Sequence, residues 1–418
     1  MMRGSAAILA TALLVVGLVV GVSVGPVTSA GATASVTLEA TFTSGLENGW
    51  AKVERYRDGS SGFVTEAYPP DGRGDQTGQP QRLFGGVARP HSSRFLLYQA
   101  PGALTGSKQV PVLLVHGANQ TADQAWANPN ALGLNGCGSS SCPTTGLMQY
   151  LDGLGYKVFA IGFPHKTGDG YYWSEQIGDA VKLVKAKTGA SQVDVIGWSK
   201  GAFNARMYVS SLRRSWGTAY AGDVRKLVLV GGPNKGFDWG YRHGWSHDVA
   251  IFPQCGGSLN APAPHTAMIC FGVWYDETQY SYEGTAFPGG RQMLARWDDI
   301  YPLPTAEQDW YTTYYGGQGF FTAGRGIQYS IDQGSLVRPL IDAGVPASVP
   351  VYQLCGSSPT MPLLHNEHTG PSDGAVFIAS CNATDGIAGR ASTVTLALNH
   401  LQLGWAAGAK SQVAAWLG

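Results

Sequence analysis

Short apolar runs alternate with stretches of helical periodicity between residues 110 and 231, and this alternation limits the possible folds more than any other feature. The apolar runs lie at 110–115, 156–162, 193–197 and 224–231. Helical patterns separate them at 146–154, 173–188 and 200–213. Uninterrupted apolar strands that are joined through helices are typical of a parallel sheet covered on both faces. The sequence therefore predicts an α/β fold with a mostly parallel central sheet flanked by helices.

Two further segments frame this alternation. Residues 35–108 are predicted to form an N-terminal β-rich extension, with strands at Val36–Phe42 and Arg94–Tyr98. The remainder, 109–418, is predicted to be one domain, with its last strands near 349–354 and 393–398 and its last helix at about 403–417.

An aromatic-rich stretch interrupts the alternation after Gly232. Residues 233–345 hold 20 of the 45 aromatic residues of the 418-residue chain. Open α/β sheets bind ligands at the carboxyl ends of their strands. We therefore expect 233–345 to be a cap or lid insertion over the active site.

The first 34 residues have the order of a secretory signal. Arg3 is the only charged residue before Glu39, residues 6–25 are almost wholly apolar, and the segment ends in Ala32-Thr33-Ala34. This order of basic, apolar and small residues predicts cleavage near Ala34 and a secreted protein. A retained membrane anchor is the alternative, because the apolar run is long enough to span a bilayer.

Six cysteines agree with export, because oxidising compartments favour disulfides. Their close spacings suggest the pairs Cys137–Cys142, Cys255–Cys270 and Cys355–Cys381, although six cysteines allow 15 connectivities.

The charge balance excludes one class of partner. Lys and Arg number 28, as do Asp and Glu, so the formal net charge is zero. Nucleic-acid binding needs a basic surplus, so no nucleic-acid partner is expected.

Gly197-Trp198-Ser199-Lys200-Gly201 matches the G-x-S-x-G pattern. The motif stands between a strand-like run and a helical pattern, which is the context of a nucleophile elbow that raises a serine to the edge of the sheet. Ser199 is therefore the candidate nucleophile.

A serine nucleophile needs a histidine base and an acid that orients it, in the chain order Ser, acid, His. His400 follows the last strand-like run and is the candidate base, with His365 and His368 as alternatives. Asp373 is the candidate acid. Asp385 competes with it, but lies only 15 residues before His400 and must share that span with a strand.

Two backbone N–H groups are expected to form the oxyanion hole. One belongs to Lys200, directly after the nucleophile, and the other to Ala118, in the loop after the first apolar run. The side chain of Lys200 is expected either to be solvated or to raise the local positive potential. Such a site needs no cofactor, and no metal site is predicted.

The chain resembles the secreted bacterial triacylglycerol lipases and esterases of the α/β-hydrolase superfamily. The motifs that carry this resemblance occur in the family's order: His116-Gly117, the Ser199 elbow, 230–236, Ser372-Asp373-Gly374 and Asn399-His400-Leu401. The resemblance implies an α/β-hydrolase fold, Ser199 as nucleophile, Asp373 as acid and His400 as base. Gln402 stands where calcium-binding members have an aspartate, so no calcium site is implied.

The predicted function is that of a secreted serine carboxylic ester hydrolase, similar to a lipase, acting on an ester or lipid at an interface or polymer surface. Candidate substrate contacts are aromatic: Trp198, Trp274, Tyr314, Tyr315 and Phe320. Alternatives are an extracellular polyhydroxyalkanoate-type depolymerase, a short-chain esterase, an acyltransferase, or a binding protein on a hydrolase scaffold. The sequence leaves acyl length and oligomeric state open.

Overall fold

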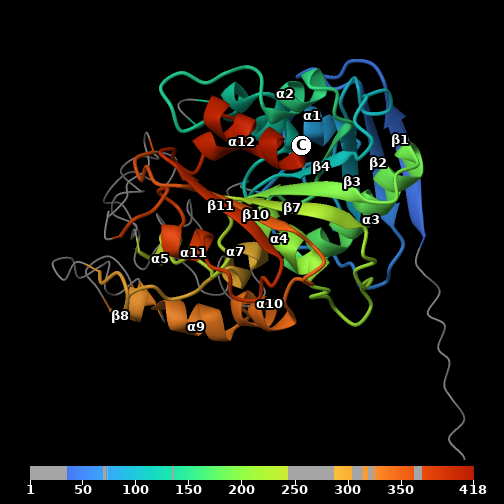
Figure 1. Ribbon diagram of the computed structural model, residues 1–418. Coiled ribbons are helices and arrows are strands. Elements are labelled where there is room, and N and C mark those ends of the chain that lie inside the picture. The colour runs from blue at the N-terminus through green and yellow to red at the C-terminus, as the bar shows by residue number, and fades with distance from the viewer. Residues whose placement is uncertain are drawn as a thin grey trace, which may run out of the picture. The chain divides into compact units, whose positions relative to one another are not determined.

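The computed structural model describes residues 35–68, 72, 74–133, 136–242, 287–303, 314–318, 323–324, 326–361 and 370–418. Its central feature is a nine-stranded sheet with the order β1-β2-β3-β5-β4-β6-β7-β10-β11 (Figure 1). The strands are β1 Val36–Phe42, β2 Lys52–Asp58, β3 Arg94–Gln99, β4 Val112–Val115, β5 Val158–Gly162, β6 Val193–Trp198, β7 Val224–Val230, β10 Val351–Gly356 and β11 Arg390–Leu396.

The helices fall between these strands. They are α1 Gly78–Leu83, α2 Leu147–Gly153, α3 Gly170–Thr188, α4 Lys200–Val209, α5 Trp239–Arg242, α7 Pro288–Gln292, α9 Gly326–Asp332, α10 Val337–Ala343, α11 Ile378–Cys381 and α12 Ala407–Leu417. Short helical turns are η1 Asp123–Ala127, η2 Pro129–Leu132 and η5 Gln402–Gly404, and β8 Gly317–Gln318 pairs antiparallel with β9 Ala323–Gly324.

Six neighbouring strands are parallel, as the sequence predicted. β5, β4, β6, β7, β10 and β11 pair in parallel, whereas β1, β2 and β3 pair antiparallel and join the sheet through β5. The β-rich segment 35–108 thus contributes three strands to the same sheet as the rest of the chain. Its division from 109–418 as a separate unit stays a prediction.

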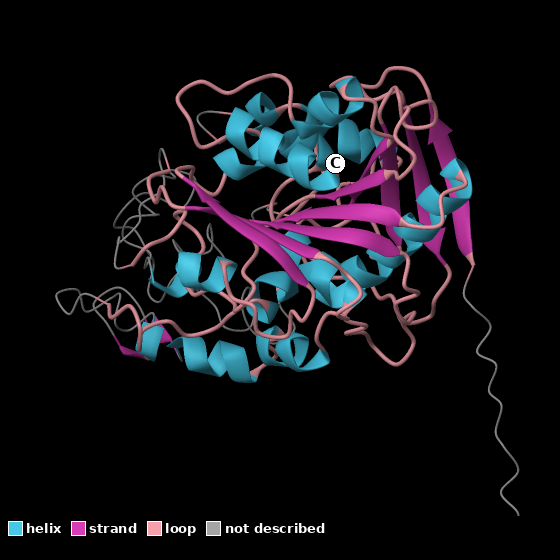
Figure 2. Ribbon diagram, viewed as in Figure 1, coloured by secondary structure: helices cyan, strands magenta, loops and turns pink. Residues whose placement is uncertain are grey.

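Alternate residues of the central strands face opposite helical layers, which explains why these strands are apolar throughout. In β4, Val112 and Leu114 pack into the core beneath α2 and α12, while Leu113 and Val115 pack into the core beneath α3 and α4. Figure 2 shows these helices on the two faces of the sheet. Because both faces are covered, the strands have no solvated side.

Strand register brings the carboxyl ends of the sheet together. Val115 of β4 lies opposite Gly197 of β6, and Trp198 lies opposite Val230 of β7. In turn, Val230 lies opposite Leu354 of β10. The loops after these strands therefore meet at one edge, where open α/β sheets bind ligands.

The described part of the aromatic insertion packs on α4. Phe203 and Met207 of α4 share a core cluster with Met293, Val337 and Leu340, so α10 and the segment after α7 lie against this helix. Residues 243–286 and 304–313 fall outside the described residues, so the placement of the insertion over the active site is described only in part.

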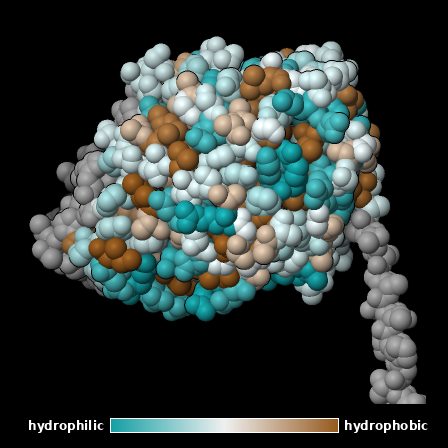
Figure 3. All heavy atoms as spheres, in the orientation of Figure 1, coloured by the Kyte–Doolittle hydropathy of each residue, from teal (hydrophilic) through white to brown (hydrophobic). Residues whose placement is uncertain are grey.

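Large apolar side chains on the surface are scattered. Leu38, Val64 and Ile300 are between 49% and 61% exposed, and Figure 3 shows hydrophobic residues interspersed with hydrophilic ones on the face that it presents. None of the helices in the described residues has the length and apolar content needed to cross a lipid bilayer.

Candidate active site

Ser199 sits in a sharp turn between β6 and α4. Its φ of 56° and ψ of −123° are unusual for a residue with a side chain, and its N–H donates to the carbonyl of Val230 at 2.8 Å. A non-glycine residue with positive φ is uncommon and is typical of functional turns. The turn is thus the strained strand–turn–helix elbow that the sequence indicated.

The two glycines of the motif are required by close backbone contacts. A Cβ on Gly197 would lie 2.5 Å from the carbonyl oxygen of Gly201, and a Cβ on Gly201 would lie 2.3 Å from that of Val115. The elbow therefore packs directly on the end of β4, with no room for a methyl group at either position.

Replacing Gly201 with alanine is expected to destabilise the fold by about 3 kcal/mol, because backbone atoms of β4 would have to move. The added Cβ would also lie 2.5 Å from the carbonyl oxygen of His116. The measurement is the midpoint of urea denaturation. Gly153→Ala is the matched control, since a Cβ there meets nothing within 4 Å, and it should change stability by less than about 1 kcal/mol. Equal midpoints for the two variants would contradict the close packing of the elbow.

His400 lies between Ser199 and Asp373. Its Nε2 lies 2.9 Å from Ser199 Oγ, and its Nδ1 lies 2.8 Å from Asp373 Oδ2. Both His400 and Asp373 are buried. A proton on Nδ1 that is donated to Asp373 leaves Nε2 free to accept from the serine hydroxyl, which is the tautomer that a general base needs. The structure thus brings together the three residues expected from the sequence.

The loop that carries Asp373 is held from several sides. Asp373 Oδ1 accepts the backbone N–H groups of Ala375 and Val376, at 3.0 and 2.8 Å. The backbone N–H of His400 donates to the carbonyl of Asp373 at 2.8 Å. The two loops are therefore joined through the backbone as well as through the side chains.

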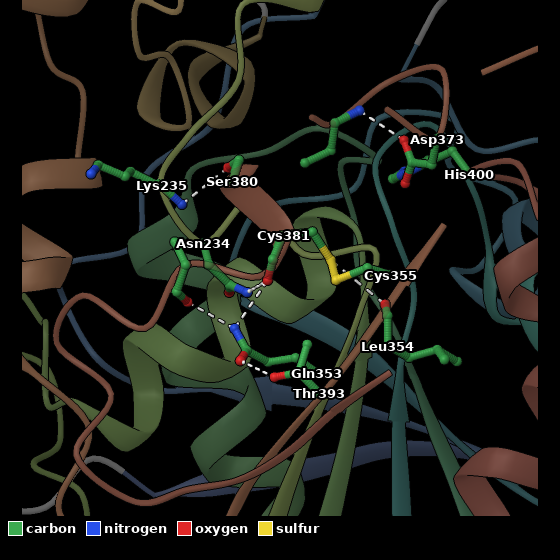
Figure 4. Close-up of a disulfide and its surroundings, with 12 residues drawn as sticks. Asn234, Lys235, Gln353, Leu354, Cys355, Asp373, Ser380, Cys381, Thr393 and His400 are labelled. Atoms are coloured by element: carbon green, nitrogen blue, oxygen red, sulfur yellow. Dashed lines mark hydrogen bonds and ion pairs between the residues drawn. A yellow bond between two sulfur atoms is a disulfide. The ribbon is translucent and has the colours of Figure 1, made fainter. Parts of the chain in front are cut away.

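A disulfide closes the acid loop, as Figure 4 shows. Cys355 at the end of β10 is bonded to Cys381 of α11, so Asp373 lies within the closed segment. The carbonyl of Cys381 accepts amide N–H groups from Asn234 and Gln353, at 2.6 and 3.0 Å. These bonds tie the bridge to β10 and to the loop after β7.

Another disulfide joins Cys137 to Cys142. The suggested partners Cys255 and Cys270 lie outside the described residues. Both observed bridges connect cysteines that the close spacing had paired.

The alternative acid, Asp385, is not paired with His400. The side chain of Asp385 is 44% exposed and its Oδ1 lies 3.6 Å from the Lys235 ammonium. His365 and His368 lie outside the described residues.

The expected oxyanion donors belong to two segments that lie next to Ser199. The N–H of Lys200 is the first amide of α4, so it has no acceptor within the helix. Ala118 lies in the turn after β4, next to Gly117, where a Cβ would come within 3.0 Å of Ser199 Cβ. A tetrahedral oxyanion requires two N–H donors beside the serine, so these two segments remain the predicted source of both.

The side chain of Lys200 is fully buried, so the expectation that it would be solvated was wrong. Its Nζ donates to Asn204 Oδ1 at 2.7 Å and lies 3.4 Å from the centroid of the Trp173 ring. The hydrogen bond and the aromatic ring take the place of water around the ammonium.

The candidate substrate contacts have different surroundings. Trp198 is buried and donates its Nε1–H to the carbonyl of His400 at 3.1 Å, so it holds the histidine loop. Tyr314 is also buried and donates its hydroxyl to Asp238 at 2.7 Å, whereas Tyr315 is exposed. Trp274 and Phe320 lie outside the described residues.

Two residues that shape the site were not predicted. A Cβ on Gly231 would lie 3.2 Å from His400 Nδ1, so glycine there gives the imidazole its space. Asn399 donates its amide to the carbonyls of Gly138 and Thr360, at 2.7 and 3.0 Å, and so anchors the histidine loop. Their positions beside recognised motifs, in 230–236 and next to His400, were the available signal.

One group of acidic residues in the described chain lies close enough together to hold a metal ion: Asp58, Glu175 and Asp179. All three carboxylates are buried, and none belongs to the group formed by Ser199, His400 and Asp373. Glu175 accepts both the N–H and the hydroxyl of Thr218, and Asp179 Oδ1 faces the Lys182 ammonium at 3.3 Å. Burial, followed by the charge of Asp58, raises the pKa of Asp179 well above its usual value.

The raised pKa of Asp179 predicts a stability difference that depends on pH. The unfolded chain releases this proton near the ordinary pKa of 3.8, whereas the folded protein retains it to higher pH. The contribution of Asp179 to the free energy of unfolding is therefore most favourable below about pH 4, and it falls as the pH rises toward the pKa of the folded state. Asp179→Asn removes this titrating group. Above about pH 4, the free energy of unfolding of the variant should therefore rise relative to that of the wild type, by up to about 1.4 kcal/mol per pH unit.

This comparison uses urea denaturation from pH 4 to pH 8 in the presence of a chelator, so that no cation neutralises the carboxylates. A constant difference between the two proteins across this range would contradict the raised pKa.

The parallel sheet, the elbow between β6 and α4, and the order of nucleophile, acid and base identify the architecture. The chain has an α/β-hydrolase fold. No protein-family model matches the sequence.

Several solved structures are similar to this α/β-hydrolase chain. A mature lipase from Bacillus licheniformis has a TM-score of 0.39 and 12% identity, covering 74% of this chain and 91% of its own. An esterase from a Rhodococcus species has a TM-score of 0.37 and 14% identity, covering 78% and 94%. A putative lipase from Sulfolobus solfataricus has a TM-score of 0.38 and 12% identity, covering 88% and 93%.

Proposed function

We propose that the protein is a secreted carboxylic ester hydrolase of the lipase type, which cleaves acyl esters through an acyl-enzyme. The observation that carries this proposal is the continuous chain of hydrogen bonds from Ser199 Oγ through His400 to Asp373, with distances of 2.9 and 2.8 Å. A nucleophile, a base and an orienting acid within hydrogen-bond reach are the requirements for covalent acyl transfer.

The first half of the reaction acylates the serine. His400 Nε2 takes the hydroxyl proton as Ser199 Oγ attacks the ester carbonyl. The resulting oxyanion accepts the N–H groups of Ala118 and Lys200, and Asp373 stabilises the imidazolium. His400 then donates the proton to the leaving alcohol, and the acyl group remains on Ser199.

The second half returns the free enzyme. Water enters, His400 takes one of its protons, and the hydroxide attacks the acyl carbonyl through a second oxyanion. Collapse releases a carboxylic acid and returns the proton to Ser199. Each step uses groups of this chain, the ester and water.

The substrate class is proposed to be an ester with an apolar acyl group, presented at a lipid interface or polymer surface. Support comes from the aromatic content of 233–345 and from the packing of its described part on α4, the helix that begins directly after Ser199. Secretion is proposed on the order of residues 1–34 and on the two disulfides, which are typical of exported proteins.

The test of this function combines a substrate series with covalent labelling. Wild-type protein is assayed on p-nitrophenyl esters from acetate to palmitate, and a fluorophosphonate probe is mapped by mass spectrometry. We expect activity and stoichiometric labelling at Ser199. Rates that rise toward palmitate support a lipase, and rates confined to acetate and butyrate assign a short-chain esterase. A protein that is neither labelled nor active on any ester would overturn the proposal.

A further inference from the structure

The side chain of Lys200 has no part in the mechanism above, which uses only its backbone N–H. It is nevertheless fully buried directly beside the nucleophile. A buried ammonium is unfavourable unless its surroundings replace the lost water. The contacts of this side chain must therefore replace the water that the ammonium has lost.

One set of contacts leads to the other oxyanion donor. Lys200 Nζ lies 3.4 Å from the centroid of Trp173, a cation–π distance. Trp173 stacks on Phe163 at 3.8 Å between centroids and meets the edge of His116 at 5.2 Å. His116 begins the loop that contains Ala118. The ammonium thus contacts the aromatic group on which that loop rests.

A second set of contacts leads to the insertion. A Cβ on Gly289 of α7 would lie 2.2 Å from Lys200 Cε and 3.0 Å from Nζ, so this helix packs directly on the lysine. Gln292 of α7 accepts the N–H of Gly170 at 2.6 Å and donates to Asp169 Oδ1 at 2.9 Å. The base of the insertion is therefore fixed to the same group of residues.

Hydrogen bonds and opposite charges complete the surroundings. Asn204, one turn along α4, accepts from Nζ at 2.7 Å and donates to the carbonyl of Gly170 at 3.3 Å. Burial lowers the pKa of Lys200 well below its usual value, and the carboxyl groups of Glu66 and Asp169 oppose this shift, although burial also raises the pKa of Glu66 to about 8. Glu66 Oε1 also accepts the backbone N–H of Asp169 at 2.6 Å.

We propose that Lys200 is a positioning residue whose buried ammonium holds the elbow, the Ala118 loop and α7 in one arrangement, and so sets the distance between the two oxyanion donors. This inference rests on the proposed ester hydrolysis. Lys200 does not touch the reacting atoms through its side chain. It acts through Trp173 and Asn204 on the groups that do.

The test is Lys200→Met, which keeps a long apolar side chain but removes the charge and the donor. Active enzyme is counted with the fluorophosphonate probe, so that loss of folded protein does not count as loss of rate. We expect kcat on p-nitrophenyl butyrate to fall about 10- to 100-fold, which is less than the effect of removing an oxyanion donor completely. KM should change less than about twofold. A trifluoromethyl ketone, which mimics the tetrahedral oxyanion, should bind more weakly by the same factor as the fall in kcat/KM.

The matched control is Lys226→Met. The ammonium of Lys226 also lies over an aromatic ring, 6.0 Å from the centroid of Tyr352, and donates to the carbonyl of Trp416 at 2.6 Å. Lys226 belongs to β7 and contacts none of the site residues described above, so kcat and ketone affinity should remain unchanged.

If Lys200→Met does not fold, Asn204→Ala tests the same arrangement. It removes the acceptor of the ammonium and should lower kcat and ketone affinity together, by a smaller factor. Where both single variants fold, the double variant should lose no more than Lys200→Met alone, because the residues act as a unit. Wild-type kcat and ketone affinity in either single variant would overturn the inference. An inactive, unlabelled wild type would instead overturn the proposed function.

Discussion

Replacing Ser199 with alanine should lower kcat on p-nitrophenyl butyrate by a factor on the order of 10⁶. The variant loses the oxygen that attacks the ester. This oxygen lies 2.9 Å from His400 Nε2 in the wild type, so the imidazole of the variant has no hydroxyl to deprotonate. The fold should survive, because alanine has the same Cβ as serine in the strained turn. The measurement is steady-state hydrolysis with the thermal midpoint recorded beside it.

If Ser199 and His400 belong to one triad, the effects of their replacement on kcat should not add. His400→Ala should cost about as much as Ser199→Ala, and the double variant should be no slower than either, because the two residues act as one unit. Ser210→Ala is the matched control, since this buried hydroxyl near the end of α4 has no hydrogen-bond partner in the described structure. Substantial activity in Ser199→Ala would mean that another group is the nucleophile.

Much of this arrangement could be predicted because the elbow leaves little freedom. Ser199 must occupy a positive φ, and both flanking glycines pack against backbone atoms. A short motif with those requirements, at the end of an apolar run, fixes the strand, the turn and the helix together. His400 could be placed because it follows the strand at the far side of the same parallel sheet.

β2 shows why charge patterning can conceal a strand. Its sequence, Lys-Val-Glu-Arg-Tyr-Arg-Asp, does not have the apolar character of the other strands, and no strand was predicted there. In the structure Glu54 is buried, and the ammonium groups of Lys52 and Lys187 lie 2.6 and 2.7 Å from its carboxylate. Lys187 comes from α3, so the partner that makes this burial possible is more than a hundred residues away along the chain.

Lys200 was misjudged for the same reason. A lysine directly after the nucleophile is adjacent in sequence to no group that could replace its hydration. Asn204 lies one turn further along α4, but Trp173 and Gly289 surround the ammonium only once α3 and α7 have packed against this helix. Sequence reasoning identified the role of the backbone at this position, but the environment of the side chain is a property of the tertiary structure.

The choice between two aspartates depends on geometry that a substitution can test. Asp373→Asn should lower kcat about 10⁴-fold, because the amide favours the wrong imidazole tautomer and no longer stabilises the imidazolium. Asp373 Oδ1 would still be available as an acceptor for the N–H groups of Ala375 and Val376, so the loop should keep its shape. The closed segment between Cys355 and Cys381 should also hold the variant side chain in place.

Asp385→Asn is the matched control for this last prediction. Asp385 lies in the segment between α11 and β11, and its side chain is 44% exposed and faces Lys235 rather than His400. Its replacement should leave kcat within about twofold of the wild type, since exposed ion pairs contribute little. Steady-state rates of the two variants, measured in the same buffer as the wild type, give the comparison. A large loss of kcat in Asp385→Asn with a near-normal kcat in Asp373→Asn would assign the acid to Asp385. The opposite pattern is expected, and it would show that His400 depends on the aspartate in the loop that the disulfide closes.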